Sequence, residues 1–192
     1  MKLEEYLSKN FQLPDEILKD LIGSGKRITL KKGEVLLQPE SKSPNVYFIE
    51  EGLVKMFYYK DYRSITHYFL LEHNFITRAE NFQTIDQNIN GLDFGIEALE
   101  HGTSIFQIPF PKIQKWSQTN VETNRIIQHI LLNILLGFSN RLNSIQFENA
   151  QDRYLLLLKN NPQIILRAPL GDIASYLGIS QQTLSVIRSQ SK

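Results

Sequence analysis

Cysteine is absent from the 192 residues of this sequence. Thiolate-bound zinc, iron–sulfur clusters, disulfide scaffolds and catalytic thiols are therefore all excluded. Long apolar runs are also absent: the stretch 130–138 is one of the longest, and it falls well short of the ~20 residues that span a bilayer. The first ten residues are polar and charged, unlike a secretory signal. These absences predict a cytoplasmic protein that makes no use of a membrane.

Neither sign of charge is in large excess, since 21 basic residues stand against 20 acidic ones. The 42% of hydrophobic residues is enough for a core, and the length fits one large domain or one medium and one small domain. After residue 118, seven basic side chains accompany four acidic ones. This mild excess permits nucleic-acid binding by the C-terminal part without requiring it.

The first half of the chain consists mainly of short strand-like runs. Residues 1–25 have helical spacing, but from residue 26 to about 108 short apolar or alternating runs are separated by turn signals. Examples of these signals are Lys32-Gly33, Glu51-Gly52 and His101-Gly102. Many short strands spaced by turns are typical of an antiparallel sandwich or barrel.

A long helix is predicted from residue 121 to about 146, where proline is absent and apolar residues recur at steps of three and four. A second apolar face includes Ile126, Ile130, Leu135 and Leu142. A helix that is apolar on two sides packs either on its own domain and a partner copy, or inside a single monomer core. In the first case, the residues expected near the two-fold axis of a homodimer are Ile127, Leu131, Ile134, Phe138 and Ile145.

Beyond the long helix, a short helix is predicted over 149–160 with Asn149 as its N-cap, followed by an extended stretch over 164–168. Two further helices, 170–177 and 180–188, come next. A glycine joins them at the position where a left-handed turn residue is needed. This is the spacing of a helix-turn-helix, although a plain helical hairpin has the same local pattern.

The last of these helices would present polar side chains to DNA. In a helix-turn-helix, the N-terminal part of the second helix enters the major groove. Side-chain amides can bond adenine, and a guanidinium can bond guanine or phosphate. The candidate DNA-binding residues are Gln181, Gln182 and Ser185 for base edges, Arg188 for phosphate, and Ser180 and Thr183 for the DNA backbone.

Four segments carry a resemblance to a known family: 30–59, with glycines at positions 33 and 52, then 96–100, 150–162 and 169–188. Their order and spacing resemble those of the Crp/Fnr family of bacterial transcription regulators. The resemblance implies an α+β protein with three parts: an N-terminal antiparallel β-roll of the cyclic-nucleotide-binding type (1–118), a dimerisation helix (119–147) and a C-terminal winged-helix domain (148–192). It further implies a homodimer that binds double-stranded DNA, responds to a small-molecule effector and contacts RNA polymerase.

The β-roll departs from the family pattern where cyclic AMP would bind. Family members that bind this ligand carry a Gly-Glu pair and, about ten residues later, an arginine that neutralises the cyclic phosphate. Here Thr77 and Arg78 stand at the Gly-Glu position, and no arginine or lysine occurs between residues 79 and 101. Cyclic AMP is therefore not the expected ligand, although Arg78 could replace the phosphate arginine from a different position. The candidate effector pocket comprises Thr77, Arg78 and Glu80. No cofactor is expected, because the four histidines lack the spacing of a metal or haem site.

No enzyme is predicted from the motifs. Phosphate loops of the P-loop or dinucleotide type, Gly-x-Ser-x-Gly and His-Glu-x-x-His are all absent from the sequence. Val186 stands where the family usually carries arginine, and Gln181 and Gln182 replace the Arg and Glu of the best-known members. These departures keep an alternative open, namely a protein-interaction or small-ligand-binding β-roll module whose helix-turn-helix is degenerate.

Overall fold

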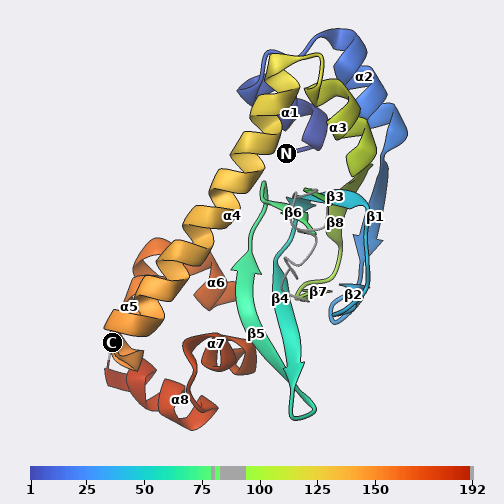
Figure 1. The fold of residues 1–192 in the computed structure, drawn as a ribbon. Helices are drawn as coiled ribbons and strands as arrows, with labels where there is room; N and C mark the ends of the chain where they lie inside the picture. The colour runs from blue at the N-terminus through green and yellow to red at the C-terminus, as the bar shows by residue number, and fades with distance from the viewer. Residues whose placement is uncertain (79–80, 83–93, 191–192) are drawn as a thin grey trace.

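Two four-stranded antiparallel sheets form a β-roll in the N-terminal part of the chain (Figure 1). The computed structural model describes residues 1–78, 81–82 and 94–190. The strand order is β1-β8-β3-β6 in one sheet and β2-β7-β4-β5 in the other. The strands are β1 (Lys26–Leu30), β2 (Val35–Leu37), β3 (Asn45–Glu51), β4 (Val54–Lys60), β5 (Arg63–Leu70), β6 (Phe75–Thr77), β7 (Gly95–Ala98) and β8 (Thr103–Pro109). The predicted series of short antiparallel strands is confirmed.

Helices cover one end of this roll and bury one face of its first sheet. Alternation along β3 sends Phe48 into a core shared with these helices and Ile49 into a second core between the two sheets. The covering helices are α1 (Leu3–Asn10), α2 (Asp15–Ser24), α3 (Phe110–Ser117) and the first half of α4 (Val121–Phe147).

Helix α4 leads from the covered end of the roll to the C-terminal helices (Figure 1). It ends one residue beyond the predicted boundary. Asn120 caps its start, because Asn120 Oδ1 accepts the N–H of Thr123 at 2.9 Å. Ile126 and Ile130 are buried, whereas most apolar residues of the second half are exposed. Within the described ranges, no helix combines the length and hydropathy needed to cross a membrane.

The C-terminal part of the described chain is helical throughout. The predicted extended stretch at 164–168 is wrong, because residues up to 167 belong to α6. Pro162 at the start of α6 favours a helical first turn, and the short apolar run that follows does not by itself distinguish helix from strand. No wing strands of the kind implied by the resemblance occur between residues 148 and 190. The helices are α5 (Ala150–Asn160), α6 (Pro162–Arg167), α7 (Leu170–Leu177) and α8 (Gln181–Gln190).

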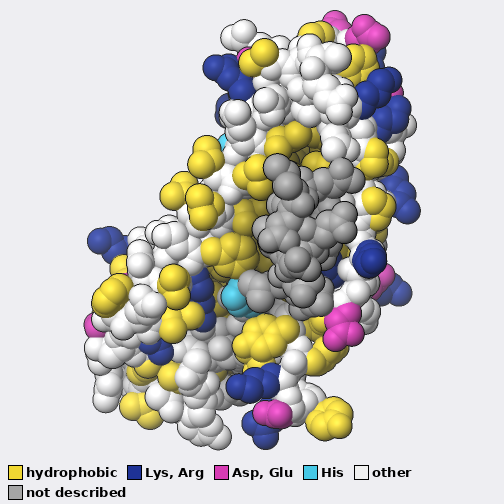
Figure 2. Space-filling model, in the orientation of Figure 1, with side chains coloured by type: hydrophobic (Ala, Val, Ile, Leu, Met, Phe, Trp, Pro, Cys, Tyr) yellow, Lys and Arg dark blue, Asp and Glu magenta, His cyan; other side chains and the backbone are white. Residues whose placement is uncertain are grey.

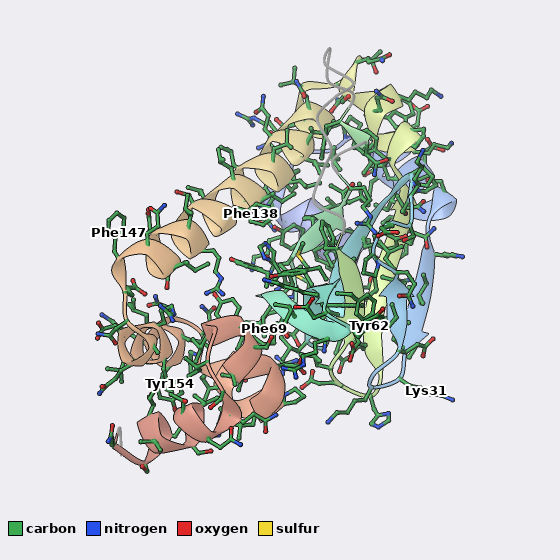
Figure 3. The ribbon with its side chains drawn as sticks, turned by 60° about the horizontal axis from the view of Figure 1, so that its bottom comes forward. Lys31, Tyr62, Phe69, Phe138, Phe147 and Tyr154 are labelled. Carbon is green, nitrogen blue, oxygen red and sulfur yellow. The ribbon has the colours of Figure 1, made fainter. Side chains whose placement is uncertain are left out.

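These helices share their apolar core with the roll. Leu53, Phe69 and Leu99 of the roll belong to the same buried cluster as Ile173 and Leu184. Figure 3 shows Phe69 between the sheet and the C-terminal helices. The division at 118 falls one residue after the end of α3, and the division at 147 falls at the end of α4. As domain boundaries they stay a prediction.

Candidate DNA-binding surface and effector pocket

A tight turn joins α7 to α8 and fixes how the two helices cross. Gly178 adopts the left-handed conformation, with φ 70° and ψ 32°. The N–H groups of Gly178 and Ile179 donate to carbonyls in the last turn of α7 at 3.0 Å, which closes that end of the helix. Ala174 and Leu184 are buried where the helices meet. The arrangement is that of a helix-turn-helix.

Several polar side chains of α8 are engaged within the motif itself. Ser180 Oγ caps the helix by accepting the N–H of Thr183 at 3.1 Å, and the two hydroxyl oxygens lie 2.9 Å apart. Ser185 Oγ donates to the carbonyl of Gln181 at 3.0 Å. The Gln181 amide rests over Gly171, where an added Cβ would lie only 2.7 Å from Gln181 Nε2. These contacts stabilise α8 and hold its first turn against α7.

The outward face of α8 is polar and exposed, as are all six candidate DNA-binding residues. Gln182, Ser185 and Ser189 follow one another at steps of three and four, so they share one stripe. Ser189 lies beyond the predicted end of this helix at Arg188, so the sequence pattern does not indicate it. Val186, which is 55% exposed, lies on this side of the helix as an apolar residue.

Most basic residues after position 118 are engaged within the molecule. Arg141 and Arg153 donate to backbone carbonyls in the last turn of α7. Arg125 and Arg167 form ion pairs with acidic side chains. Helix α8 carries Arg188 as its one cation. The charge excess of the C-terminal part therefore adds less to a DNA-facing surface than its count suggests.

Buried polar contacts dock α7 against β4 and the edge strand β5. Lys55 Nζ lies 2.7 Å from Asp172 Oδ1 and 3.2 Å from Glu97 Oε2. Thr66 binds α7 twice: its hydroxyl donates to Asp172 Oδ1 and its N–H donates to Ser175 Oγ, each at 3.0 Å. The orientation of the helix-turn-helix relative to the roll is fixed by these bonds.

Arg167 at the end of α6 forms a second attachment. Its guanidinium lies 2.7 Å from a Glu72 oxygen and 2.6 Å from a Glu100 oxygen. The two carboxylates also accept the N–H groups of Gly52 and Leu53 in the β3–β4 turn, both at 2.9 Å. Burial alone would raise the pKa of Glu72, but the hydrogen bonds from Arg167 and the backbone outweigh it and lower the pKa to about 2.

The predicted dimer residues share one side of α4, but the molecule covers some of them and leaves others exposed. Ile127 and Ile134 pack against the core under the N-terminal helices, and Phe138 faces the roll (Figure 3). Leu131 and Ile145 are exposed. Figure 2 shows hydrophobic side chains along the outer side of this helix. The exposed stripe of α4 consists of Leu131, Leu132, Leu135, Leu136, Leu142 and Ile145.

The spacing of apolar residues could not tell these faces apart. Both sides of α4 are apolar, so the pattern says that two surfaces are contacted without saying which side meets the roll. Of the second predicted face, Ile126 and Ile130 are buried, whereas Leu135 and Leu142 are exposed.

A cavity of about 80 Å³ lies between the roll and α4. Its walls come from β4, β5 and β6 on one side and from the middle of α4 on the other. They are mostly apolar, with few polar groups. The lining residues include Met56, Tyr68, Leu70, Thr77, Ile134 and Phe138.

Of the three candidate effector residues, Thr77 lines this cavity. Arg78 is 2% exposed, and its Nη2 donates to the carbonyl of Gln38 at 2.9 Å. The guanidinium carbon lies 4.7 Å from the centroid of the Phe94 ring. Arg78 Nε and Nη1 have no hydrogen-bond partner, and no described carboxylate pairs with this side chain. Glu80 lies outside the described residues.

No family model matches the chain, and no curated protein matches it in sequence. Solved structures are similar in fold. FixK2 from Bradyrhizobium japonicum is 18% identical, with a TM-score of 0.71 over 86% of this chain and 83% of that one. A Eubacterium rectale protein assigned to the Crp/Fnr family of transcriptional regulators is 15% identical, with a TM-score of 0.74 over 98% and 87%. The c-di-GMP-responsive global regulator CLP from Xanthomonas campestris is 14% identical, with a TM-score of 0.66 over 92% and 91%.

At these identities the likeness shows the fold alone. The β-roll, the long helix and the C-terminal helices have the same arrangement as in these regulators, over more than four-fifths of each chain. The resemblance found in the sequence, and the α+β class expected from it, are confirmed at this level.

Proposed function

We propose that this chain, which has the fold of the Crp/Fnr regulators, acts as a dimeric DNA-binding transcription regulator and not as an enzyme. The observation that carries the proposal is the α7–α8 motif, whose turn is closed by a left-handed glycine and whose second helix shows a polar outer stripe. In this proposal residues 148–192 read DNA, 119–147 dimerise and 1–118 receive an effector. RNA polymerase is the further partner that a regulator of this type would contact.

Selection from a random duplex library tests the DNA-reading function. Two copies of α8 related by a two-fold axis should enrich a near-palindromic motif whose half-sites are centred roughly 34 Å apart, one turn of the duplex. Purified protein should then shift the enriched duplex in a gel, with an affinity that falls steeply as salt is raised. A selection that enriches no two-fold motif would contradict the proposal.

Gln182 is the side chain best placed to read a base, because it lies on the outer stripe and no described residue hydrogen-bonds its amide. Gln182→Ala should cost about 1–3 kcal/mol on the selected site and relax the preference at one position. Arg188→Ala should instead weaken all duplexes alike and reduce the salt slope by about one. Fluorescence anisotropy at several salt concentrations separates the two effects. Gln151→Ala, at an exposed glutamine on α5, is the matched control and should change neither.

The proposed homodimer rests on the exposed stripe of α4. Six exposed large apolar side chains, spread over about half of the circumference of the helix, form a patch of the kind that soluble monomers rarely leave uncovered. A second copy is the natural partner, because a two-fold axis along the stripe would pair it with itself and bring two α8 helices to one duplex.

Cyclic AMP is expected not to bind the roll. The cavity is apolar, and a cyclic phosphate placed there without a cation would lose its hydration without compensation, at a cost of several kcal/mol. Arg78 is held by Gln38 and stacks over Phe94, and it is not among the residues that line the cavity. Calorimetry with micromolar to millimolar cyclic AMP should therefore show no saturable heat. Stoichiometric binding would contradict this expectation, and its loss in Arg78→Ala would identify the replacement cation.

One observation favours a second candidate function, that of a protein-interaction module with a degenerate helix-turn-helix. Val186 exposes an apolar side chain on the outer side of α8, where a contact with phosphate or base would favour a polar one. A protein partner could bury it. Failure of the duplex selection, with retained dimerisation, would make this the better proposal.

A further inference from the structure

The β4–β5 hairpin ends in a two-residue turn whose second position is poorly suited to the tyrosine that occupies it. Asp61 and Tyr62 occupy the two turn positions with positive φ angles of 50° and 60°, between the paired residues Lys60 and Arg63. Aspartate is favoured at the first of these positions, but the second favours glycine, and a bulky side chain such as that of Tyr62 in the left-handed region is an outlier. Tyr62 is also fully exposed, at 104%, so its ring packs on nothing. A strained residue that adds nothing to the core points to a role outside folding.

The hairpin tip, defined here as residues 59–63, has the chemistry of a surface that contacts a nucleic-acid backbone. Lys60 and Arg63 are exposed and form no ion pair with any residue of the described ranges. Tyr59 and Tyr62 place two exposed phenol rings beside them. Lysine, arginine and tyrosine side chains all bond phosphate oxygens in protein–DNA complexes. Figure 2 shows basic, acidic and hydrophobic side chains together at this end of the molecule, and Asp61 is the one acidic residue of the tip.

The position of the tip is tied to that of α8. Strand β5 carries the tip at one end and is bonded to α7 through Thr66 farther along. Figure 1 shows the tip at the same end of the molecule as α7 and α8, and Figure 3 turns that end forward with Tyr62 labelled. A duplex bound by α8 would therefore have the tip as a fixed neighbour.

The single positive charge of α8 is a second reason to expect another DNA-contacting surface. Phosphate neutralisation supplies much of the affinity of proteins for DNA, and it needs several cations. Helix α8 itself carries one cation, Arg188. The other arginines of the C-terminal helices, Arg141, Arg153 and Arg167, bond backbone carbonyls or carboxylates and are not free to bind phosphate. We propose that the hairpin tip is a second DNA-contacting surface, at which Lys60 and Arg63 bind phosphates of the duplex that flanks the sequence read by α8. The proposal rests on the proposed DNA-binding function.

Two duplex lengths test it: the selected site alone, and the same site with about ten extra base pairs, one helical turn, on each side. Lys60→Ala/Arg63→Ala should weaken binding to the long duplex about tenfold or more at 0.1 M salt. The same variant should lower the salt slope by roughly two to four, since a dimer has two tips. Binding to the short duplex should not change. Lys9→Ala/Lys19→Ala, which removes two exposed cations from α1 and α2 at the other end of the molecule, is the matched control and should bind as the wild type does.

The variant Tyr62→Gly separates an effect on DNA contact from an effect on folding stability. Glycine relieves the positive φ, so the unfolding midpoint should stay the same or rise while affinity for the long duplex falls. Equal binding of the long duplex by the tip variant and the control would overturn the hairpin proposal and leave α8 as the reader. A wild type that binds neither duplex would overturn both proposals. Unchanged DNA binding with a lost transcriptional response would assign the tip to a protein partner and overturn the phosphate contact.

Discussion

Leu135→Glu is expected to convert the dimer into a monomer and to remove measurable duplex binding. Leu135 is 63% exposed in the single chain, so the fold of the protomer does not need its side chain. In a dimer packed through the exposed stripe of α4, two-fold symmetry would place two glutamates in an apolar interface. An uncompensated buried charge costs roughly 3–5 kcal/mol. The cost of burying two such charges is comparable with the binding free energy of roughly 8 kcal/mol for a dimer with a micromolar Kd.

Light scattering at micromolar concentration measures this outcome, and circular dichroism should show that the helices persist. Leu166→Glu makes the same substitution at a 77% exposed leucine on α6, outside the exposed stripe of α4, and should stay dimeric. Leu131→Glu, on the stripe, should behave as Leu135→Glu does. A monomeric wild type, or a dimeric Leu135→Glu, would contradict the interface.

Arg167→Leu is expected to lower the free energy of unfolding by roughly 1–3 kcal/mol at pH 7, because two half-buried carboxylates lose the cation that they share. The effect should depend on pH. Glu72 has a pKa of about 2 in the folded protein, below its ordinary value of 4.5, so it binds protons less readily when folded. Its contribution to stability is therefore present above pH 4.5 and is lost as the pH falls towards 2.

Urea denaturation at pH 7, 4 and 3 measures both parts of this expectation. The difference between wild type and Arg167→Leu should be largest at pH 7 and should shrink as the pH is lowered. Arg125→Leu removes an arginine whose ion pair with Glu122 is exposed, and it should cost less than about 1 kcal/mol. If the two substitutions lowered the free energy of unfolding equally, or if the difference did not vary with pH, the ion pairs of Arg167 would not hold α6 to the roll.

Local patterns in the sequence predict those structural features that depend only on neighbouring residues. Asn149 caps α5 as expected, because an N-cap needs a side-chain oxygen within reach of the next N–H groups. Gly178 sits in the left-handed turn because glycine lacks the Cβ that opposes it. The length of α4 followed from the absence of proline over many turns.

Other features depend on residues far apart in the chain, and spacing does not reveal them. Which side of α4 meets the roll is decided by the shape of the roll surface, so spacing alone does not show that Phe138 lines the cavity beside the helix. Nothing in the sequence pattern indicates that Lys55 pairs with Asp172. The same holds for the pairing of Arg167 with Glu72. The direction of Arg78 is likewise set by a loop about forty positions earlier.

The pairing of Lys55 with Asp172 joins positions 117 residues apart, and it has a consequence for the nascent chain. Synthesis delivers the N-terminal part first, so the roll can form while α7 is still being made. Until α7 arrives, β5 is an uncovered edge strand beside the apolar Leu53 and Phe69. Uncovered edges of this kind promote association between chains. Synthesis that stopped before residue 170 would therefore yield an aggregation-prone sheet, and not a free-standing sensor.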